Sequence, residues 1–443
     1  NLGEETTDPS GAFTPITDTN LIDGVVNPDS GATGYVDFVI TFQPLKHIQI
    51  SSAQLVGVQS VASSVEFLQQ STDRQIDHLF HYYKPEFEAM QTPSYLVGWD
   101  FPLNPCQELG ATIVASAIGA NKSKYVWDQT IIFQSANSGV GVTRGAAGEI
   151  VLTAAATTQM ALVQYLDATE ARKLLNGRMS VNISAKASVA TNATVSLWYT
   201  TNATLPVITA GTNNSIVLTL GTNGSVATRN GTWSEVPRSS LGDALMSIGT
   251  SATTEFNDYS FSGWDLDGIA GTDTATFFAI VIGTASVTTP GTVSVYSVGL
   301  CAGDIATRPA PQTRDEVLRE CRYYYQTSFA PGYPSANNAT LSSGPIYAIQ
   351  YVAAGAVNII SIRFSVPMRV KPVYPPLYYN PTSGAAGQVL NVTTGASYSS
   401  TSSYGSSELS QNGFVMQGTA DAGSVVGNLI AVNWSVDARL GVI

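Results

Sequence analysis

Two histidines come closest to forming a metal site by their type and spacing. His78 and His81 stand three positions apart in STDRQIDHLFHYY, where helical spacing would turn them toward one face near Asp73 and Asp77. Zinc sites use three or four strong protein ligands, so two histidines with neighbouring aspartates are a weak signal. We therefore interpret both histidines as packed or solvated imidazoles, and we predict no metal ligand and no cofactor.

Nucleophilic catalysis is not indicated either. The chain has one further histidine, His47, so all three lie before residue 82. A nucleophile–histidine–acid triad would have to reach across domains, and no nucleophile-elbow sequence occurs. Paired carboxylates for glycoside hydrolysis cannot be recognised in a sequence, because their separation is three-dimensional. We assign no catalytic residue and expect a protein that is not an enzyme.

A group of aspartates could form a calcium loop. Asp265, Asp267 and Asp273 are spaced among glycines in GWDLDGIAGTD. The bidentate glutamate that closes an EF-hand loop is missing, so we favour an ordinary Asp-Gly turn over structural calcium.

Aromatic side chains are the best candidates for sugar binding, because exposed rings stack on the apolar faces of pyranoses. Trp264 and Tyr259 occur in the polar, loop-like stretch NDYSFSGWDLDG and are the two candidate glycan contacts. For Trp264, packing in a core or an interface is the favoured alternative. Trp198, Trp233 and Trp434 lie in strand patterns, which predicts that they belong to cores.

The three cysteines, Cys106, Cys301 and Cys321, are odd in number and widely spaced. This arrangement fits neither a disulfide framework nor a paired metal-ligand spacing. Free cysteine behaves as a small hydrophobic residue, so we predict three buried free thiols.

Charge and composition limit the partners. The net charge is -12, the sequence pI is about 4.6 and the 20 basic residues are scattered, which argues against nucleic-acid and anionic-membrane partners. We find no apolar run of about 18 residues that would predict a transmembrane helix. The first residues, NLGEETTD, lack the basic and apolar regions of a signal peptide, and a removed upstream signal remains an open alternative. Only 12% of residues are charged, so hydroxyl and amide groups form much of the polar surface, as suits large subunit contacts.

Period-2 alternation of apolar side chains predicts an all-β fold. It occurs in RMSVNISAKASV, TVSLWYT, IISIRFSV and LIAVNWSV. Asn-Gly pairs at 223–224 and 230–231 supply the positive φ that tight turns need. Many short strands with frequent turns predict tandem β-sandwich, jelly-roll domains. The strand YVDFVITF and short helices at 71–83 and 167–178 are also expected.

A third helix is predicted after residue 312, where Thr313 and Glu316 form a capping box. Val317, Leu318, Cys321, Tyr324 and Tyr325 recur at spacings of three and four, between a Pro-Ala-Pro link and Pro331-Gly332. An isolated helix of about a dozen residues is marginal in water. We therefore predict an inter-domain seam formed by Leu318, Cys321, Tyr324 and Tyr325, with the tyrosines from 323 to 325 filling it. Glycan stacking by these tyrosines is the weaker alternative.

Several stretches together resemble bacteriophage tail-fibre and virion-appendage proteins. The most specific is TVSVYSVGLCAGDIATRPAPQTRDEVLRECRYYYQTSF, which resembles the family's last sandwich strand, Pro-containing link and helix with paired tyrosines. Other matching pieces follow in order: SYLVGWDFPLNP, KYVWDQ, LNGRMSVNISAKAS, NGTWSEVP, RFSVPMRVKPVY and LIAVNWSVDARL. The resemblance covers roughly residues 94–443 and is strongest at 290–330 and near the C-terminus.

The resemblance implies a carbohydrate-binding-module-like jelly roll at 94–308 and a helix-led C-terminal β-domain at 309–443. Residues 1–93 are not covered by it, and we interpret them as an N-terminal assembly or attachment region. It implies a non-enzymatic virion structural protein forming a fibre, a spike or a capsid or tail decoration. The expected partners are copies of the chain, as a homo-oligomer and first of all a trimer, other virion proteins and a host saccharide. The alternatives are a secreted cell-surface carbohydrate-binding or surface-layer protein and a glycan depolymerase.

Overall fold

A computed structural model of the chain describes residues 94–440 apart from gaps at 108–111, 114–119, 137–139, 168–176, 203–204, 206–207, 209–214, 239–243, 250–254, 267–276, 289, 304–305, 307–308, 311, 332, 334–343, 351–356, 373–375, 400–408 and 420–424. The three histidines, the strand predicted at 35–42 and the helix predicted at 71–83 lie outside the described residues. The helix predicted within 167–178 falls on a gap. The predicted domain boundaries stay predictions. Across the described ranges, no helix is long and apolar enough to cross a membrane.

The first sheet has six antiparallel strands in the order β1-β4-β5-β15-β7-β13. These strands are β1 (Thr112–Ile113), β4 (Val140–Arg144), β5 (Ile150–Ala154), β7 (Arg178–Ala187), β13 (Asn257–Asp265) and β15 (Thr292–Ala302). The predicted strand at 178–189 is β7, and Met179, Val181 and Ile183 belong to the core as expected. The polar residues between them point to the opposite face and are buried too, so β7 is covered on both faces.

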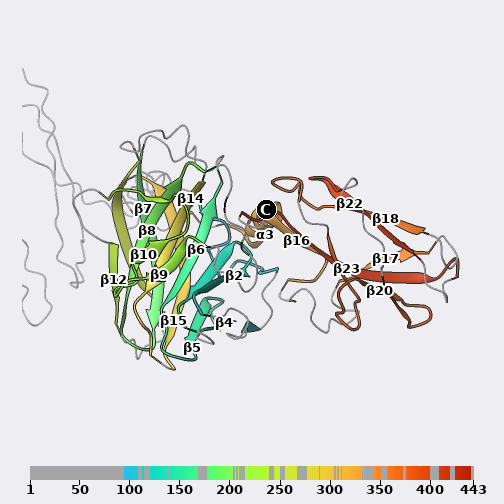
Figure 1. The fold of residues 1–443 in the computed structure, drawn as a ribbon, viewed down its shortest axis with the longest axis horizontal. Helices are drawn as coiled ribbons and strands as arrows, with labels where there is room; N and C mark the ends of the chain where they lie inside the picture. Colours follow the sequence, from blue (N-terminus) through green and yellow to red (C-terminus); the bar gives the residue numbers. More distant parts are fainter. Residues whose placement is uncertain are drawn as a thin grey trace, which may run out of the picture. The chain divides into compact units, whose positions relative to one another are not determined.

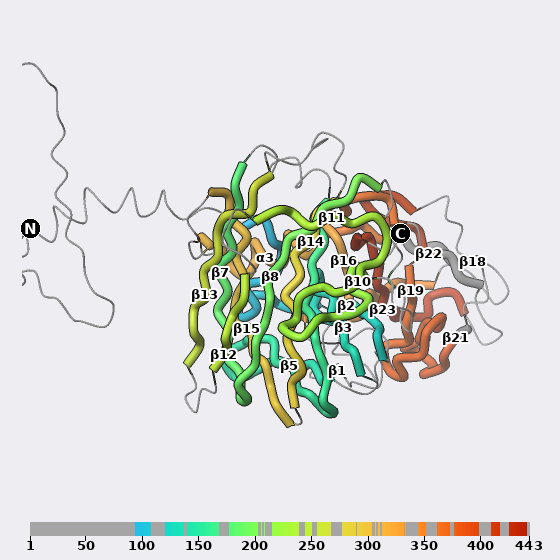
Figure 2. Tube along the Cα trace, turned by 60° about the vertical axis from the view of Figure 1, so that its left-hand side comes forward, coloured from blue at the N-terminus to red at the C-terminus, as the bar shows by residue number. Residues whose placement is uncertain are grey.

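The second sheet has the order β11-β8-β14-β6-β3-β2, with β12 also paired to β8. Its strands are β2 (Lys122–Trp127), β3 (Thr130–Gln134), β6 (Met160–Leu166), β8 (Thr191–Thr200), β11 (Ser234–Glu235), β12 (Ala244–Ile248) and β14 (Phe277–Thr284). Side chains from both sheets form one buried core, so the sheets are the two layers of a β-sandwich (Figure 1). Figure 2 follows β15, β7 and β13, which run side by side in the first layer. The predicted all-β sandwich is confirmed.

A hairpin packs on the outer face of the second sheet. Its strands are β9 (Val217–Leu220) and β10 (Val226–Arg229), joined through the predicted Asn-Gly turn. Gly224 in this turn has φ +85°, and a Cβ added there would lie 2.1 Å from the carbonyl oxygen of Gly283 in β14. The rings of Tyr165 and Trp233 stack nearby with centroids 5.6 Å apart, and burial raises the pKa of Tyr165. The second sheet is therefore covered by the chain itself.

The C-terminal strands form a smaller sandwich. One sheet contains β16 (Tyr325–Thr327), β17 (Ile346–Ile349), β19 (Leu377–Tyr379), β20 (Gln388–Asn391), β21 (Ser397–Ser399) and the central strand β23 (Leu429–Asp437), and the other pairs β18 (Val357–Arg363) with β22 (Gly413–Thr419). As predicted from alternation, Ile430, Val432, Trp434 and Val436 lie in its core. Ile362 of β18 belongs to the same core, which shows that the two sheets of the smaller sandwich share it.

The only helix in the described ranges is α3, Arg314–Tyr324, which follows the predicted signals. The Thr313 hydroxyl accepts a hydrogen bond from the Glu316 backbone N–H at 3.3 Å, and the Glu316 carboxylate accepts one from the Thr313 N–H at 2.7 Å. These bonds complete the predicted capping box and hold the pKa of Glu316 below its usual value. The helix is thus fixed at its start by its own sequence.

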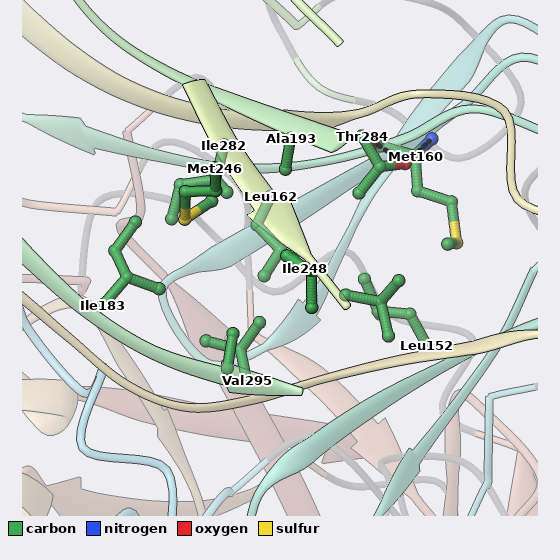
Figure 3. A pocket seen from close by; sticks show the side chains of 12 residues that line it. Leu152, Met160, Leu162, Ile183, Ala193, Met246, Ile248, Ile282, Thr284 and Val295 are labelled. Atoms are coloured by element: carbon green, nitrogen blue, oxygen red, sulfur yellow. Dashed lines mark hydrogen bonds between the residues drawn. The ribbon is translucent and has the colours of Figure 1, made fainter. Parts of the chain in front are cut away.

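A small cavity lies between the layers of the larger sandwich (Figure 3). Its volume is about 10 Å³, close to the minimum for one water molecule. Met246 and Ile248 of β12 and Leu162 of β6 face Ile183 and Val295 of the first sheet across it. Because the lining is almost wholly apolar, the cavity is a packing defect and not a ligand site.

Enlarging this cavity should destabilise the sandwich. Met246→Ala is expected to lower the free energy of unfolding by about 2–5 kcal/mol, because it removes buried methylenes and leaves a larger void. Denaturant unfolding measures the change. Leu245→Ala is the matched control on the same strand, because Leu245 is 41% exposed and should lose under about 0.5 kcal/mol. Equal losses of unfolding free energy in the two variants would contradict the interpretation that Met246 packs beside a buried cavity and Leu245 does not.

Candidate functional site

A pocket with a volume of about 340 Å³ lies on the face of β15 that points away from the sandwich core. We call it the outer pocket. It forms beyond the end of β5, which pairs with β15 only as far as Val295. There the segment 94–101 takes the place of β5 and runs along β15, with Tyr95 N donating to Leu300 O at 2.9 Å. The lining includes Asp100, Pro102, Tyr296, Ser297, Pro309 and Gln312.

A β-bulge creates the floor of the outer pocket. Val295 pairs with Ala185 and Ser297 pairs with Ser184, so Tyr296 is an extra residue in β15. Its half-buried ring packs against Phe256 with the centroids 5.1 Å apart. The bulge therefore places an aromatic ring next to a serine hydroxyl on the outer face of the first sheet.

One wall is the turn at 101–104, which Arg144 holds in place. Its guanidinium donates to the carbonyl oxygens of Phe101, Pro102 and Asn104 at 3.1, 3.0 and 2.9 Å. The same guanidinium lies 5.4 Å from the ring centroid of Trp127. Three hydrogen bonds from one side chain thus hold the carbonyl oxygens of this turn in place.

The opposite wall is the Pro-containing link before α3. Pro309 lies over Gly299 of β15 so closely that a Cβ on Gly299 would be 2.5 Å from the proline ring. Gln312 donates its amide to Glu320 of α3 at 2.9 Å. The start of the helix thus fixes this wall.

Polar side chains continue the same face beyond the pocket. Asn182 of β7 donates from Nδ2 to the Ser260 hydroxyl at 3.1 Å, and its buried Oδ1 has no hydrogen-bond partner within the described part of the chain. Lys186 lies over the Phe256 ring at 4.1 Å and pairs with Glu149 at 3.6 Å. Because Asn182 and Glu149 are buried, the groups on this face that a ligand can reach are the half-buried ones that line the outer pocket, among them Asp100, Tyr296 and Gln312.

Trp264 and Tyr259, the two predicted glycan contacts, do not line the outer pocket. Trp264 is 1% exposed and belongs to the core, which is the packing that was favoured from the sequence, so it is not available as a glycan contact. It lies on β13, where a register shift after Phe261 pairs it with Met179. Tyr259 packs partly against the same core, its hydroxyl lies 3.4 Å from Ser247 O, and burial raises its pKa.

The two sandwiches meet at a buried arginine. The guanidinium of Arg439 lies between two tyrosine rings, 4.2 Å from the centroid of Tyr125 and 4.6 Å from that of Tyr325. It makes a bidentate pair with Asp437 and donates to the backbone oxygen of Asp128 at 2.9 Å. We call these five residues the joint. Tyr125 belongs to β2, Tyr325 is the first residue of β16, and Asp437 is the last residue of β23.

Further polar contacts cross the joint. Gln107 donates from its backbone to Asp128 Oδ1 at 2.8 Å and from its side chain to the carbonyl oxygen of Tyr325 at 3.0 Å. The Tyr125 hydroxyl donates to the carbonyl oxygen of Leu440. Burial raises the pKa of Tyr125 well above its usual range although Arg439 acts in the opposite direction. Burial thus favours the protonated hydroxyl, which is the form that donates this hydrogen bond.

The residues predicted for the seam have different surroundings. Cys321 and Tyr324 are buried on α3, and Tyr325 contacts Arg439. Leu318 is half-buried, and its place in the seam stays a prediction. Tyr323 is 40% exposed, so the expectation that all three tyrosines fill the seam is wrong for it.

The other predicted sites are also placed. All three cysteines are free and buried, as predicted, and burial together with the charge of Asp128 raises the pKa of Cys321. Asp265 lies on β13, whereas Asp267 and Asp273 fall outside the described residues. In the described ranges, no group of three metal-ligating side chains occurs.

The residues of the outer pocket and of the joint were largely missed by sequence reasoning. Asp100 and Tyr296 lie in stretches that resemble the virion family, but no pattern joins positions that far apart. The sequence Asp437-Ala438-Arg439 held a usable signal, because opposite charges two positions apart in an apolar context suggest a buried ion pair.

No family model matches the chain, and no curated protein matches it. Among solved structures, it is similar to TmCBM61 in complex with beta-1,4-galactotriose, with 8% identity, a TM-score of 0.25 and coverage of 48% of this chain and 100% of that one. It is also similar to a family 29 carbohydrate binding module from Piromyces equi, with 12% identity, a TM-score of 0.19 and coverage of 43% and 90%. A third is the enzymatically active domain of bacteriophage CBA120 tailspike protein 4, with 13% identity, a TM-score of 0.22 and coverage of 40% and 19%. At these values the likenesses carry no argument about function.

Replacing the arginine of the joint by lysine should destabilise the protein. In Arg439→Lys the charge remains buried, but the ammonium cannot bind Asp437 with two parallel bonds and stack between two rings. We expect a loss of about 3 kcal/mol in the free energy of unfolding, measured by denaturant titration. Arg229→Lys is the control, because exposed Arg229 lies 5.5 Å from the Trp198 ring and should lose under about 1 kcal/mol. A loss at Arg439 no larger than at Arg229 would show that the joint is not stabilised by the guanidinium.

Proposed function

We propose that the chain is a non-enzymatic structural protein of a virus particle, with a phage as the favoured source, and that its larger sandwich binds a host saccharide in the outer pocket. The pocket is the observation that carries the saccharide part. Tyr296 offers a ring, Ser297 a hydroxyl, Gln312 an amide and Asp100 a carboxylate, which are the groups that bind sugar faces and sugar hydroxyls.

The size of the outer pocket supports a ligand of one or two sugar rings. Small-molecule pockets have volumes of about 300–1,000 Å³, and this one lies at the lower end of that range. The site is therefore suited to a short motif or the end of a glycan.

The virion role rests on the stretches that resemble tail-fibre and appendage proteins, and the C-terminal sandwich supports it. Tyr347 and Ile349 of β17 and the paired Leu429 of β23 are 48%, 52% and 37% exposed. Large apolar side chains grouped on one sheet are suited to burial against another subunit. We propose that copies of the chain assemble through this surface, as a trimer, into a fibre, spike or decoration.

Saccharide binding should depend on the ring of Tyr296. Tyr296→Ala is expected to weaken binding to a glycan array about tenfold or more without loss of thermal stability, because it removes the stacking platform. Tyr333→Ala is the control, because Tyr333 is 45% exposed and lies outside the pocket. If the bound polysaccharide instead releases reducing ends on incubation with the protein, the depolymerase alternative replaces the binding role.

Assembly should depend on the exposed β17 surface. The purified chain is expected to be a trimer by light scattering and an elongated or spike-like particle by electron microscopy. Ile349→Asp should give a monomer, because a carboxylate would be desolvated in the contact. Leu377→Asp, at an exposed position on β19, should leave the trimer intact. A monodisperse single-copy wild-type protein would contradict the proposal.

A further inference from the structure

The side chains that a ligand can reach in the outer pocket are mainly apolar. Some lining residues, such as Trp99, belong to the sandwich core. Most of the half-buried lining residues are apolar or aromatic, namely Pro102, Leu103, Tyr296, Pro309 and Ala310. Pro102 and Leu103 belong to the wall formed by the turn, and Pro309 and Ala310 belong to the wall formed by the link before α3. A ligand in the pocket therefore lies between two apolar walls.

The half-buried polar lining residues are already bonded within the protein. Ser94 Oγ accepts hydrogen bonds from two backbone N–H groups at 3.1 and 3.2 Å, which leaves its O–H as a donor. Gln312 donates from Nε2 to Glu320 Oε1 at 2.9 Å. Asp100 also interacts with other groups of the chain. These side chains therefore keep only part of their hydrogen-bonding capacity for the hydroxyls of a sugar.

Leu103 is a large apolar side chain that does not belong to a core. It is half-buried in the turn, and none of the hydrophobic clusters in the described part of the chain includes it. Its backbone N–H donates to the carbonyl oxygen of Asp100 at 3.1 Å, and Arg144 holds the carbonyl oxygens on either side of it. The wall thus presents an apolar side chain on a fixed backbone.

A methyl group suits a space between apolar walls better than a hydroxyl does. A hydroxyl that is buried there without a partner loses its hydrogen bonds to water, whereas burial of a methyl group is favourable. A 6-deoxyhexose carries a methyl group in place of the hydroxymethyl group of the parent sugar. An N-acetylhexosamine presents the methyl of its acetyl group. Either sugar could pack this group against Leu103 and leave its remaining hydroxyls to the few polar groups.

We infer that the outer pocket selects saccharide units that carry a methyl group, either a 6-deoxyhexose or an N-acetylhexosamine. This inference rests on the proposed saccharide function of the pocket, and it names the class of sugar. It follows from the two facing apolar walls, from a half-buried leucine outside the core, and from polar side chains that are already bonded.

Matched sugars on one common linker test the inference directly. L-Fucose and L-galactose differ only by the oxygen at C6, as do L-rhamnose and L-mannose, and N-acetylglucosamine differs from N-formylglucosamine only by a methyl group. In titrations of the full chain, the methyl-bearing member of at least one pair should bind about tenfold more tightly. A preference in the first two pairs assigns a 6-deoxyhexose, and a preference in the third assigns an N-acetylhexosamine. Tyr296→Ala should remove the binding, which places it in the outer pocket.

Two substitutions assign the preference to the walls. Leu103→Asn should bring the affinities within the bound pair several-fold closer, because an amide replaces the apolar surface on which the methyl group packs. Leu245→Asn is the control, because Leu245 is 41% exposed on β12 and lies outside the pocket, so the ratio should not change. Melting temperatures show whether each variant folds. Ala310→Ser places a hydroxyl on the opposite wall with little change in volume, and it should reduce the ratio even if Leu103→Asn does not fold.

The outcomes separate the inference from the function on which it rests. Equal or weaker binding of the methyl-bearing sugar in every pair overturns the methyl selection and leaves saccharide binding intact. A ratio that is unchanged in both wall variants also overturns the selection. If none of the six sugars binds, a glycan array decides: a ligand without a methyl group overturns the inference alone, and the absence of any ligand overturns saccharide binding as well. Binding that survives Tyr296→Ala places the site elsewhere and overturns both.

Discussion

The charge of Arg439 must be compensated in a region where the side chain is only 4% exposed. Removing a guanidinium from water costs several kcal/mol unless hydrogen bonds and an opposite charge replace the lost hydration. Here the replacement comes from Asp437 close by in sequence, and from Tyr125 and Asp128 more than 300 positions away. The same guanidinium thus contacts residues of both sandwiches, and it stabilises the contact between them.

The segment that leads into the joint also builds the outer pocket. Pro309 and Gln312 form a wall of the pocket, and α3 follows directly with its capping box. At the other end of the helix, Tyr324 is buried and Tyr325 enters the stack on Arg439. One short stretch of chain thus forms a wall of the outer pocket at its beginning and a contact between the two sandwiches at its end.

Local patterns were enough to predict the strands and the helix, but not the sites. The alternation in β7 and β23 and the Thr313–Glu316 box depend on neighbours in sequence, and they are found as expected. Core packing of Trp264 was favoured, but its strand was taken for a loop because serines, aspartates and glycines surround it, whereas pairing with β7 and a bulge turn its ring inward. The joint and the pocket bring distant segments together, and a single sequence carries no record of such pairings.

The hairpin of β9 and β10 has a consequence for the larger sandwich as a whole. Its turn touches β14 backbone to backbone at Gly224, so one broad surface is occupied by the protein's own chain. The outer pocket and the β-bulge at Tyr296 lie on the opposite surface. A molecule that binds in the outer pocket, as proposed, therefore has to approach the larger sandwich from the side opposite this hairpin.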